Sequence, residues 1–400
     1  MMLWQWLSGP LSVLCCGFCP DFSNTFLLVN GRKYSIVRLL KEDDMSFLYL
    51  VRLEDGMPLL SAAASGDDDD GYESVNTYTL KRIRCPIGNI SNVSDAMREI
   101  DNYKRFQSPY VVSSVDSQVI QELDGAKTIY IVFPHYPLGS LQDSIDDRIL
   151  DGTFVSESEC IRIMCGIARG LLCLHDSSSA PRGVRTLTTG VDEGTSDNVN
   201  ADFNLSDNLG DDRDKISASY TDEAGLSMDE HLLELDSIST TSVVPVSYSH
   251  KMLSPSNIIF SSNGLPIISE LGSCSKADVE IKTAKQLNRL REWVDDNFNS
   301  YMAPEFLDLK TNSKLSTKVD VWSFGCICYA LLFGMNPFER EEQLYGASIK
   351  YAISTGKFSF PSQSRYSDSI LDIIRSCLQV DPSERPSVSI VLNNLQQLQS

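Results

Sequence analysis

The stretch Asp320-Val321-Trp322-Ser323-Phe324-Gly325 lies at the start of a strongly apolar segment, residues 319–333, which we predict to be a helix. Upstream, apolar side chains recur at helical spacing over residues 156–175, and this periodicity predicts a second long helix. Two more helices are predicted downstream, over residues 367–378 and 388–398.

Strand patterns dominate the first third of the chain. Residues 31–53 predict a hairpin, and residues 94–106 predict one helix with Ser94 as its N-cap. Further strands are predicted over residues 77–83, 111–121 and 127–133. Because strands come first and helices afterwards, we expect an α+β fold with two lobes.

Composition and charge exclude some classes of function. The chain has 400 residues and a formal net charge of −20. This balance argues against broad nucleic-acid binding, which needs a basic face, and against docking on anionic lipid by charge alone. The 11 cysteines are odd in number and mostly lie in apolar runs, so we interpret them as buried free thiols rather than as disulfides or zinc ligands.

Residues 1–30 are predicted to be a cysteine-containing anchor segment. The first 20 residues are apolar but lack the basic region of a secretory signal, and position 2 is not glycine, which argues against myristoylation. Cys15, Cys16 and Cys19 lie beside aromatic residues, a pattern that favours S-acylation. Two or more acyl chains give stable membrane anchoring. The alternatives are a plain apolar tail or a first strand.

An acidic insert interrupts the helical half at about residues 180–245. Residues 191–236 contain 14 Asp and Glu against 2 Lys and Arg, so this segment buries too little apolar surface to order itself. Within it, residues 228–235 form either a transient helix or a binding motif, or are simply disordered. The insert is either regulatory, through phosphorylation or a basic partner, or an inert linker.

Three motifs that fall in order resemble those of eukaryotic protein kinases. They are Ala303-Pro304-Glu305, the Asp320–Gly325 stretch and Asp381-Pro382-Ser383-Glu384-Arg385-Pro386. The resemblance implies a bilobal kinase fold, with an N-lobe over residues 31–138 and a C-lobe over residues 139–400. It also implies a buried, bidentate ion pair between Arg385 and Glu305.

The resemblance also assigns a nucleotide site. Lys81 matches the strand lysine that contacts the α- and β-phosphates of ATP, and Glu99 matches its helix partner. Phe133 is then the gatekeeper, and His135 and Tyr136 belong to the hinge that contacts the nucleotide.

The chain is similar to the lipid-anchored Ser/Thr kinases of the Numb-associated kinase group. The likeness rests on Leu80–Cys85, Glu270-Leu271-Gly272-Ser273 and Tyr301–Glu305. It implies an acylated N-terminus, protein partners and residence on the cytoplasmic face of an internal membrane of the Golgi, vacuole or endosome type.

The glycine-rich loop departs from the kinase pattern. Such a loop lets backbone N–H groups approach the phosphates, because glycine has no side chain. Here Lys41 and Asp43 stand at glycine positions, and Glu42 and Asp44 add negative charge nearby. Taken alone, the stretch is read as an ordinary strand turn.

The catalytic loop, His250-Lys251-Met252-Leu253-Ser254-Pro255-Ser256-Asn257, departs further. Met252 stands where kinases have the carboxylate base, and a thioether cannot titrate. Ser254 replaces the lysine that steadies the transferring phosphate, whereas Asn257, a metal-site residue, is kept. Glu270 replaces the metal-binding Asp and is one methylene longer, which impairs Mg²⁺ geometry.

These departures lead to two hypotheses. The first is a pseudokinase, a membrane-tethered scaffold or regulator in which binding of ATP and Mg²⁺ is weak or absent. The second is an active, atypical Ser/Thr kinase, in which Glu270 and Asn257 hold metal and another carboxylate replaces Met252. The retained Lys81, Glu99 and Asn257 motivate the second.

Overall fold

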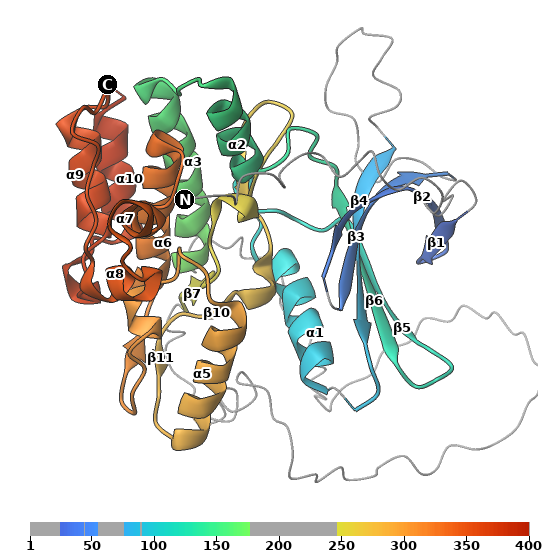
Figure 1. The fold of residues 1–400 in the computed structure, drawn as a ribbon. Helices are drawn as coiled ribbons and strands as arrows, with labels where there is room; N and C mark the ends of the chain where they lie inside the picture. The colour runs from blue at the N-terminus through green and yellow to red at the C-terminus, as the bar shows by residue number, and fades with distance from the viewer. Residues whose placement is uncertain (1–24, 44, 55–75, 89, 177–245, 400) are drawn as a thin grey trace, which may run out of the picture.

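The computed structural model describes residues 25–43, 45–54, 76–88, 90–176 and 246–399. These residues form a β-sheet lobe and a helical lobe, which confirms the predicted α+β fold (Figure 1). Cys15, Cys16, Cys19 and the insert at 180–245 lie outside the described residues.

The N-lobe is one antiparallel sheet with strand order β1-β2-β3-β4-β6-β5. Its strands are β1 (Phe26–Val29), β2 (Arg32–Glu42), β3 (Ser46–Leu53), β4 (Thr77–Cys85), β5 (Asp116–Gln121) and β6 (Lys127–Pro134). The predicted hairpin is present as β2 and β3, and β1 extends it by one strand that the sequence pattern missed.

Two boundaries in the N-lobe were predicted wrongly. Helix α1 (Ile90–Arg105) begins soon after a turn at Gly88, whose φ is +81°, so Ser94 lies inside the helix and is not its N-cap. The strand predicted from residue 111 begins only at Asp116. Val111 instead bridges to Ile268 of the C-lobe, and the Val112 amide donates to the Ile268 carbonyl at 2.8 Å.

The C-lobe is built around α6 (Lys318–Phe333), whose residues from Val319 to Leu332 are buried. The other helices are α2 (Leu141–Asp151), α3 (Glu157–His175), α5 (Ala284–Asn297), α7 (Pro337–Tyr345), α8 (Ile349–Thr355), α9 (Asp368–Cys377) and α10 (Val388–Gln397). The four helices predicted in this lobe are therefore present, whereas α2, α5, α7 and α8 were not anticipated. Three two-stranded sheets complete the described C-lobe: β7 (Tyr248–Ser249) with β10 (Ser275–Lys276), β8 (Ile258–Phe260) with β9 (Pro266–Ile268), and β11 (Val279–Glu280) with β12 (Lys314–Leu315).

The described cysteines behave as predicted. All eight are free thiols, and seven of them are buried: Cys85, Cys160, Cys165, Cys274, Cys326, Cys328 and Cys377. Within the part of the chain that the structure describes, no single helix has the length and apolar character to cross a membrane. By those two criteria only the bent pair of α6 and α7, which turns through 64°, would qualify.

A buried ion pair ties α6 to the two segments that flank it. The Arg385 guanidinium donates to both carboxylate oxygens of Glu305, each at 2.8 Å, as the sequence motifs implied. It also donates to the carbonyl of Lys318 at 2.8 Å and to that of Gln379 at 2.7 Å. Because the Arg385 side chain is fully buried, its charge depends on Glu305 for compensation.

We predict that Glu305→Gln lowers the free energy of unfolding by about 3 kcal/mol, because the variant leaves a buried guanidinium without a counter-charge. Asp308→Asn is the matched control, since Asp308 forms an exposed pair with Lys310 at 2.7 Å. The control is expected to cost less than about 1 kcal/mol. Urea denaturation measures both, and equal losses in the two variants would contradict the assignment.

Candidate active site

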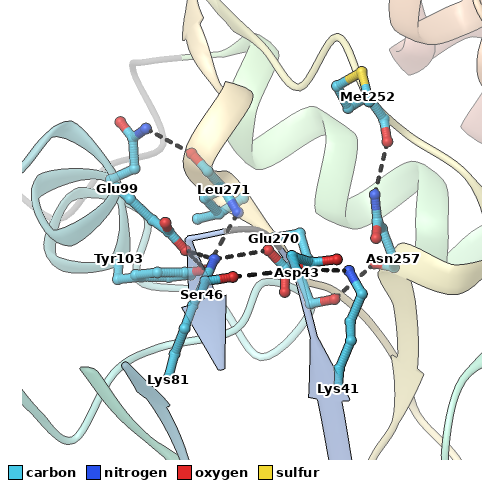
Figure 2. A network of polar contacts seen from close by, with 12 residues as sticks. Lys41, Asp43, Ser46, Lys81, Glu99, Tyr103, Met252, Asn257, Glu270 and Leu271 are labelled. Atoms are coloured by element: carbon cyan, nitrogen blue, oxygen red, sulfur yellow. Dashed lines mark hydrogen bonds and ion pairs between the residues drawn. The ribbon is translucent and has the colours of Figure 1, made fainter. Parts of the chain in front are cut away.

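A triad of charged side chains joins the sheet, helix α1 and the C-lobe. The Lys81 ammonium of β4 lies 2.7 Å from Glu99 Oε1 on α1 and 3.0 Å from Glu270 Oε2, which follows β9 (Figure 2). The predicted Lys81–Glu99 pair is therefore present. Burial alone would lower the pKa of Lys81, but the two carboxylates raise it above its usual value, so the lysine stays charged.

Glu270 occupies an unusual backbone position. Its φ is +58°, in the left-handed region that side-chain-bearing residues rarely adopt. The Lys81 ammonium lowers the pKa of Glu270, so the group is a carboxylate at neutral pH. The Glu270 side chain keeps 40% of its surface exposed, against 12% for Lys81. Its oxygens are therefore accessible from the cleft between the lobes.

Side chains of helix α1 form hydrogen bonds with main-chain atoms of the segment that follows Glu270. The Asn102 amide donates to the carbonyls of Leu271 at 2.9 Å and Cys274 at 2.8 Å. The Tyr103 hydroxyl accepts from the Leu271 amide at 3.3 Å and donates to Glu99 Oε1 at 2.8 Å (Figure 2). Residues Glu99, Asn102 and Tyr103 thus use one face of α1, at spacings of three and four, to fix the Glu270 segment.

The catalytic loop is anchored on Asp320 at the start of α6. The fully buried Asp320 carboxylate accepts from the backbone amides of His250 at 2.7 Å and Lys251 at 2.9 Å. It also lies 2.9 Å from His175 Nε2 at the end of α3. His250 Nε2 donates to the Ser269 carbonyl at 2.8 Å, and burial lowers the pKa of His250, so its ring is neutral.

Met252 does not present its side chain as a base would. It is partly buried against the C-lobe core, and its sulfur accepts a weak hydrogen bond from Asn299 Nδ2 at 3.8 Å. The Met252 carbonyl accepts from Asn257 Nδ2 at 2.7 Å (Figure 2). The amide nitrogen of Asn257 is thus used within the loop, and its oxygen is the donor atom left for a metal ion.

A cleft of about 610 Å³ lies between the lobes. Its walls include the predicted gatekeeper Phe133 and the predicted hinge residues His135 and Tyr136. Its floor includes Asn257 and Glu270, whereas Met252 and Ser254 are not among the lining residues. The Phe133 ring packs edge-on against Tyr103 at 4.9 Å between centroids, and both rings line the cleft.

The β2–β3 connection is a tight turn, as its sequence indicated. The Asp43 amide donates to the Ser46 carbonyl at 2.8 Å, and the Ser46 amide donates back at 3.3 Å. The Lys41 ammonium pairs with Asp43 Oδ2 at 3.1 Å (Figure 2). Lys41 lines the same cleft as Asn257 and Glu270.

The residues present fit ATP and Mg²⁺. The cleft volume lies within the range of small-molecule sites, and Glu270, which lines the cleft, is paired with the charged Lys81 at 3.0 Å. Glu270 and Asn257 offer hard oxygen donors, and Mg²⁺ is commonly held by one or two carboxylates together with substrate phosphates. Among the described residues no three His, Cys, Asp or Glu side chains form a complete metal cage.

Comparison with known proteins identifies the family. Residues 246–395 match the protein kinase domain, and the chain is 50% identical over 386 residues to the serine/threonine-protein kinase ENV7 of Saccharomyces cerevisiae, with 96% of each chain covered. The chain belongs to the serine/threonine protein kinase family. The chain is also 26% identical over 376 residues to the serine/threonine-protein kinase ppk13 of Schizosaccharomyces pombe. This match covers 94% of the chain and 93% of ppk13. Over 374 residues the chain is 22% identical to serine/threonine-protein kinase 16 of Mus musculus, covering 93% and 92%.

Sequence reasoning missed several residues of the site. Asn102 and Tyr103 were not singled out, although their positions three and four residues after Glu99 place them on the same helix face. His175, which contacts Asp320, was also missed. His250 was named only as part of the loop motif, without its contact to Asp320. Arg38 of β2 lines the cleft without any signal in the sequence.

We predict that Tyr103→Phe destabilises the kinase by about 1–2 kcal/mol, because the Glu99 carboxylate and the Leu271 amide both lose a buried partner. Deuterium exchange at the Leu271 amide should rise in this variant. Tyr366→Phe is the matched control, since its hydroxyl also makes a buried bond, to the Val155 carbonyl at 3.2 Å. If exchange at residue 271 rises equally in both variants, or in neither, Tyr103 does not hold this segment.

Proposed function

We propose that this protein is an ATP-dependent Ser/Thr kinase that transfers phosphate without a carboxylate at the usual base position. The observation that carries the proposal is the assembled triad, with Lys81 2.7 Å from Glu99 and 3.0 Å from Glu270. A chain that had lost its nucleotide chemistry would have no need to keep a buried lysine charged between two carboxylates, because such an arrangement costs desolvation energy.

The absence of a carboxylate at position 252 does not by itself prevent phosphate transfer. The transferred phosphoryl group passes through a loose transition state, so the attacking hydroxyl keeps its proton until late and catalysis rests on positioning and electrostatics. Lys81 supplies charge at the α- and β-phosphates and holds the Glu270 carboxylate, and Asn102 and Tyr103 of α1 fix the main chain that follows Glu270. Glu270 and Asn257 would hold Mg²⁺, and the ion would supply positive charge at the phosphates.

A scaffold function is the second candidate, and Met252 favours it. Its side chain packs on the C-lobe core instead of entering the cleft, and Ser254 leaves the loop without its usual lysine. In this alternative the protein binds protein partners through its lobes, with or without nucleotide. The two candidates differ in one measurable property, which is phosphate transfer.

We predict that the purified protein is stabilised thermally by ATP with Mg²⁺ or Mn²⁺ and incorporates labelled phosphate into a Ser/Thr protein substrate. Lys81→Ala should lose incorporation by at least about 100-fold, since the charge at the phosphates is removed. Lys310→Ala, which removes an exposed lysine of the C-lobe, is the control. Nucleotide-dependent stabilisation without incorporation in wild type would favour the scaffold, and absence of both would overturn ATP binding as well.

We further propose that acylation of Cys15, Cys16 and Cys19 anchors the kinase to the cytoplasmic face of an internal membrane. The proposal rests on the cysteine cluster beside aromatic residues and on the need for two acyl chains for stable anchoring. Replacing all three by Ser should release the protein from the membrane fraction and abolish thioester labelling by acyl exchange. Replacing Cys173, a described free thiol, is the control. Membrane binding that persists in the triple variant would contradict this anchor.

A further inference from the structure

We propose that Lys41 binds the terminal phosphates of the nucleotide, in place of the charge that Ser254 no longer provides. The inference rests on the proposed ATP binding and names a residue that contributes to it. From the sequence, Lys41 counted against phosphate binding, because it occupies a position at which glycine would let the backbone approach phosphate. The structure places its ammonium where a positive side chain can act instead.

The strand register places Lys41 on the same face of the sheet as Lys81. Lys41 pairs across β2 and β3 with Leu48, and Leu48 pairs across β3 and β4 with Lys81. Partners that face each other in antiparallel strands project to the same side of the sheet. Lys41 and Leu48 both line the cleft. The two lysines therefore belong to one row, roughly 10 Å apart at their backbones by strand spacing.

A register irregularity in β2 helps to set this position. The β2–β3 pairing shifts between Leu39 and Lys41, and a bulge of this kind redirects the side chains that follow it. From this position the Lys41 side chain turns toward the end of the hairpin, where Asp43 lies (Figure 2). Its exposed fraction is 61%, so the ammonium is free to reorient toward a ligand in the cleft.

The charges near the outer end of the cleft support a phosphate contact. Lys41 pairs with Asp43 at 3.1 Å, and Ser46 Oγ is 3.4 Å from the same carboxylate oxygen. Without Lys41, the Asp43 carboxylate would lose its counter-charge and would repel a phosphate brought near it.

Arg38, the other cation of β2 that lines the cleft, lies near the predicted hinge. Arg38 also lines the cleft, but its charge acts on His135 of the hinge, where it adds to the effect of burial in lowering the pKa of the ring. In the strand register Arg38 pairs with Leu50, Leu50 with Thr79 and Thr79 with Phe133, so Arg38 lies in the row that leads to the predicted hinge. Of the two described cations that line the cleft, Arg38 and Lys41, Lys41 is therefore the one that shares a row of the sheet with Lys81.

Calorimetric titration of the full chain with ATP and with adenosine, both in the presence of Mg²⁺, tests the proposal. Lys41→Ala should weaken ATP binding about 10-fold and leave adenosine binding unchanged, because only ATP carries the phosphates. Asp43→Asn should tighten ATP binding, since it frees Lys41 and removes a repelling charge. Lys33→Ala is the matched control, because Lys33 lies on the same strand, pairs with Glu54 at 2.6 Å and does not line the cleft.

The outcomes separate this inference from the proposed function. If wild type binds ATP and Lys41→Ala binds it equally well, the role of Lys41 is overturned while ATP binding stands. Equal loss of ATP and adenosine binding in Lys41→Ala would also overturn it, since the residue would then act on the shape of the cleft. If wild type binds neither ligand, the proposed kinase function fails together with the inference.

Discussion

The arrangement of the catalytic loop depends on one buried carboxylate. Asp320 has no exposed surface and accepts from two successive backbone amides, those of His250 and Lys251. Both amides can point at one carboxylate because Lys251 adopts a φ of +67°. His175 contacts the same group from α3, so a single side chain joins two helices and the loop. The positions of Met252 and Asn257 follow from this anchor, whatever chemistry their side chains retain.

The sequence predicted the ion pairs of the fold better than the directions of its side chains. The Lys81–Glu99 and Arg385–Glu305 pairs follow from motif order, because the kinase fold brings those segments together in one way only. The orientations of Lys41 and Met252 do not follow from it. One depends on a register shift in β2 and the other on a core that accommodates a thioether, and neither feature has a local signature in the sequence.

The same limit explains which elements were missed. Helix α5 is amphipathic and short of apolar residues, so its sequence reads as a polar connection until its capping box at Thr283 and Gln286 is recognised. Helix α2 also begins with a capping box, at Ser140 and Asp143. The strand expected from residue 111 failed for another reason. Its residues alternate as in a strand, but the main chain around Val111 forms hydrogen bonds with Ile268 of the C-lobe instead of with the N-lobe sheet.

The hold of α1 on the C-lobe has a mechanical consequence. Asn102 and Tyr103 bond to main-chain atoms of residues 271–274, and a methyl group at Gly272 would approach Glu99 Oε2 to 3.2 Å. The helix and this C-lobe segment therefore form a single stiff unit that straddles the two lobes. Because Lys81 of β4 pairs with Glu99 of the same helix at 2.7 Å, a displacement of α1 would move this partner of the lysine and the Glu270 segment together.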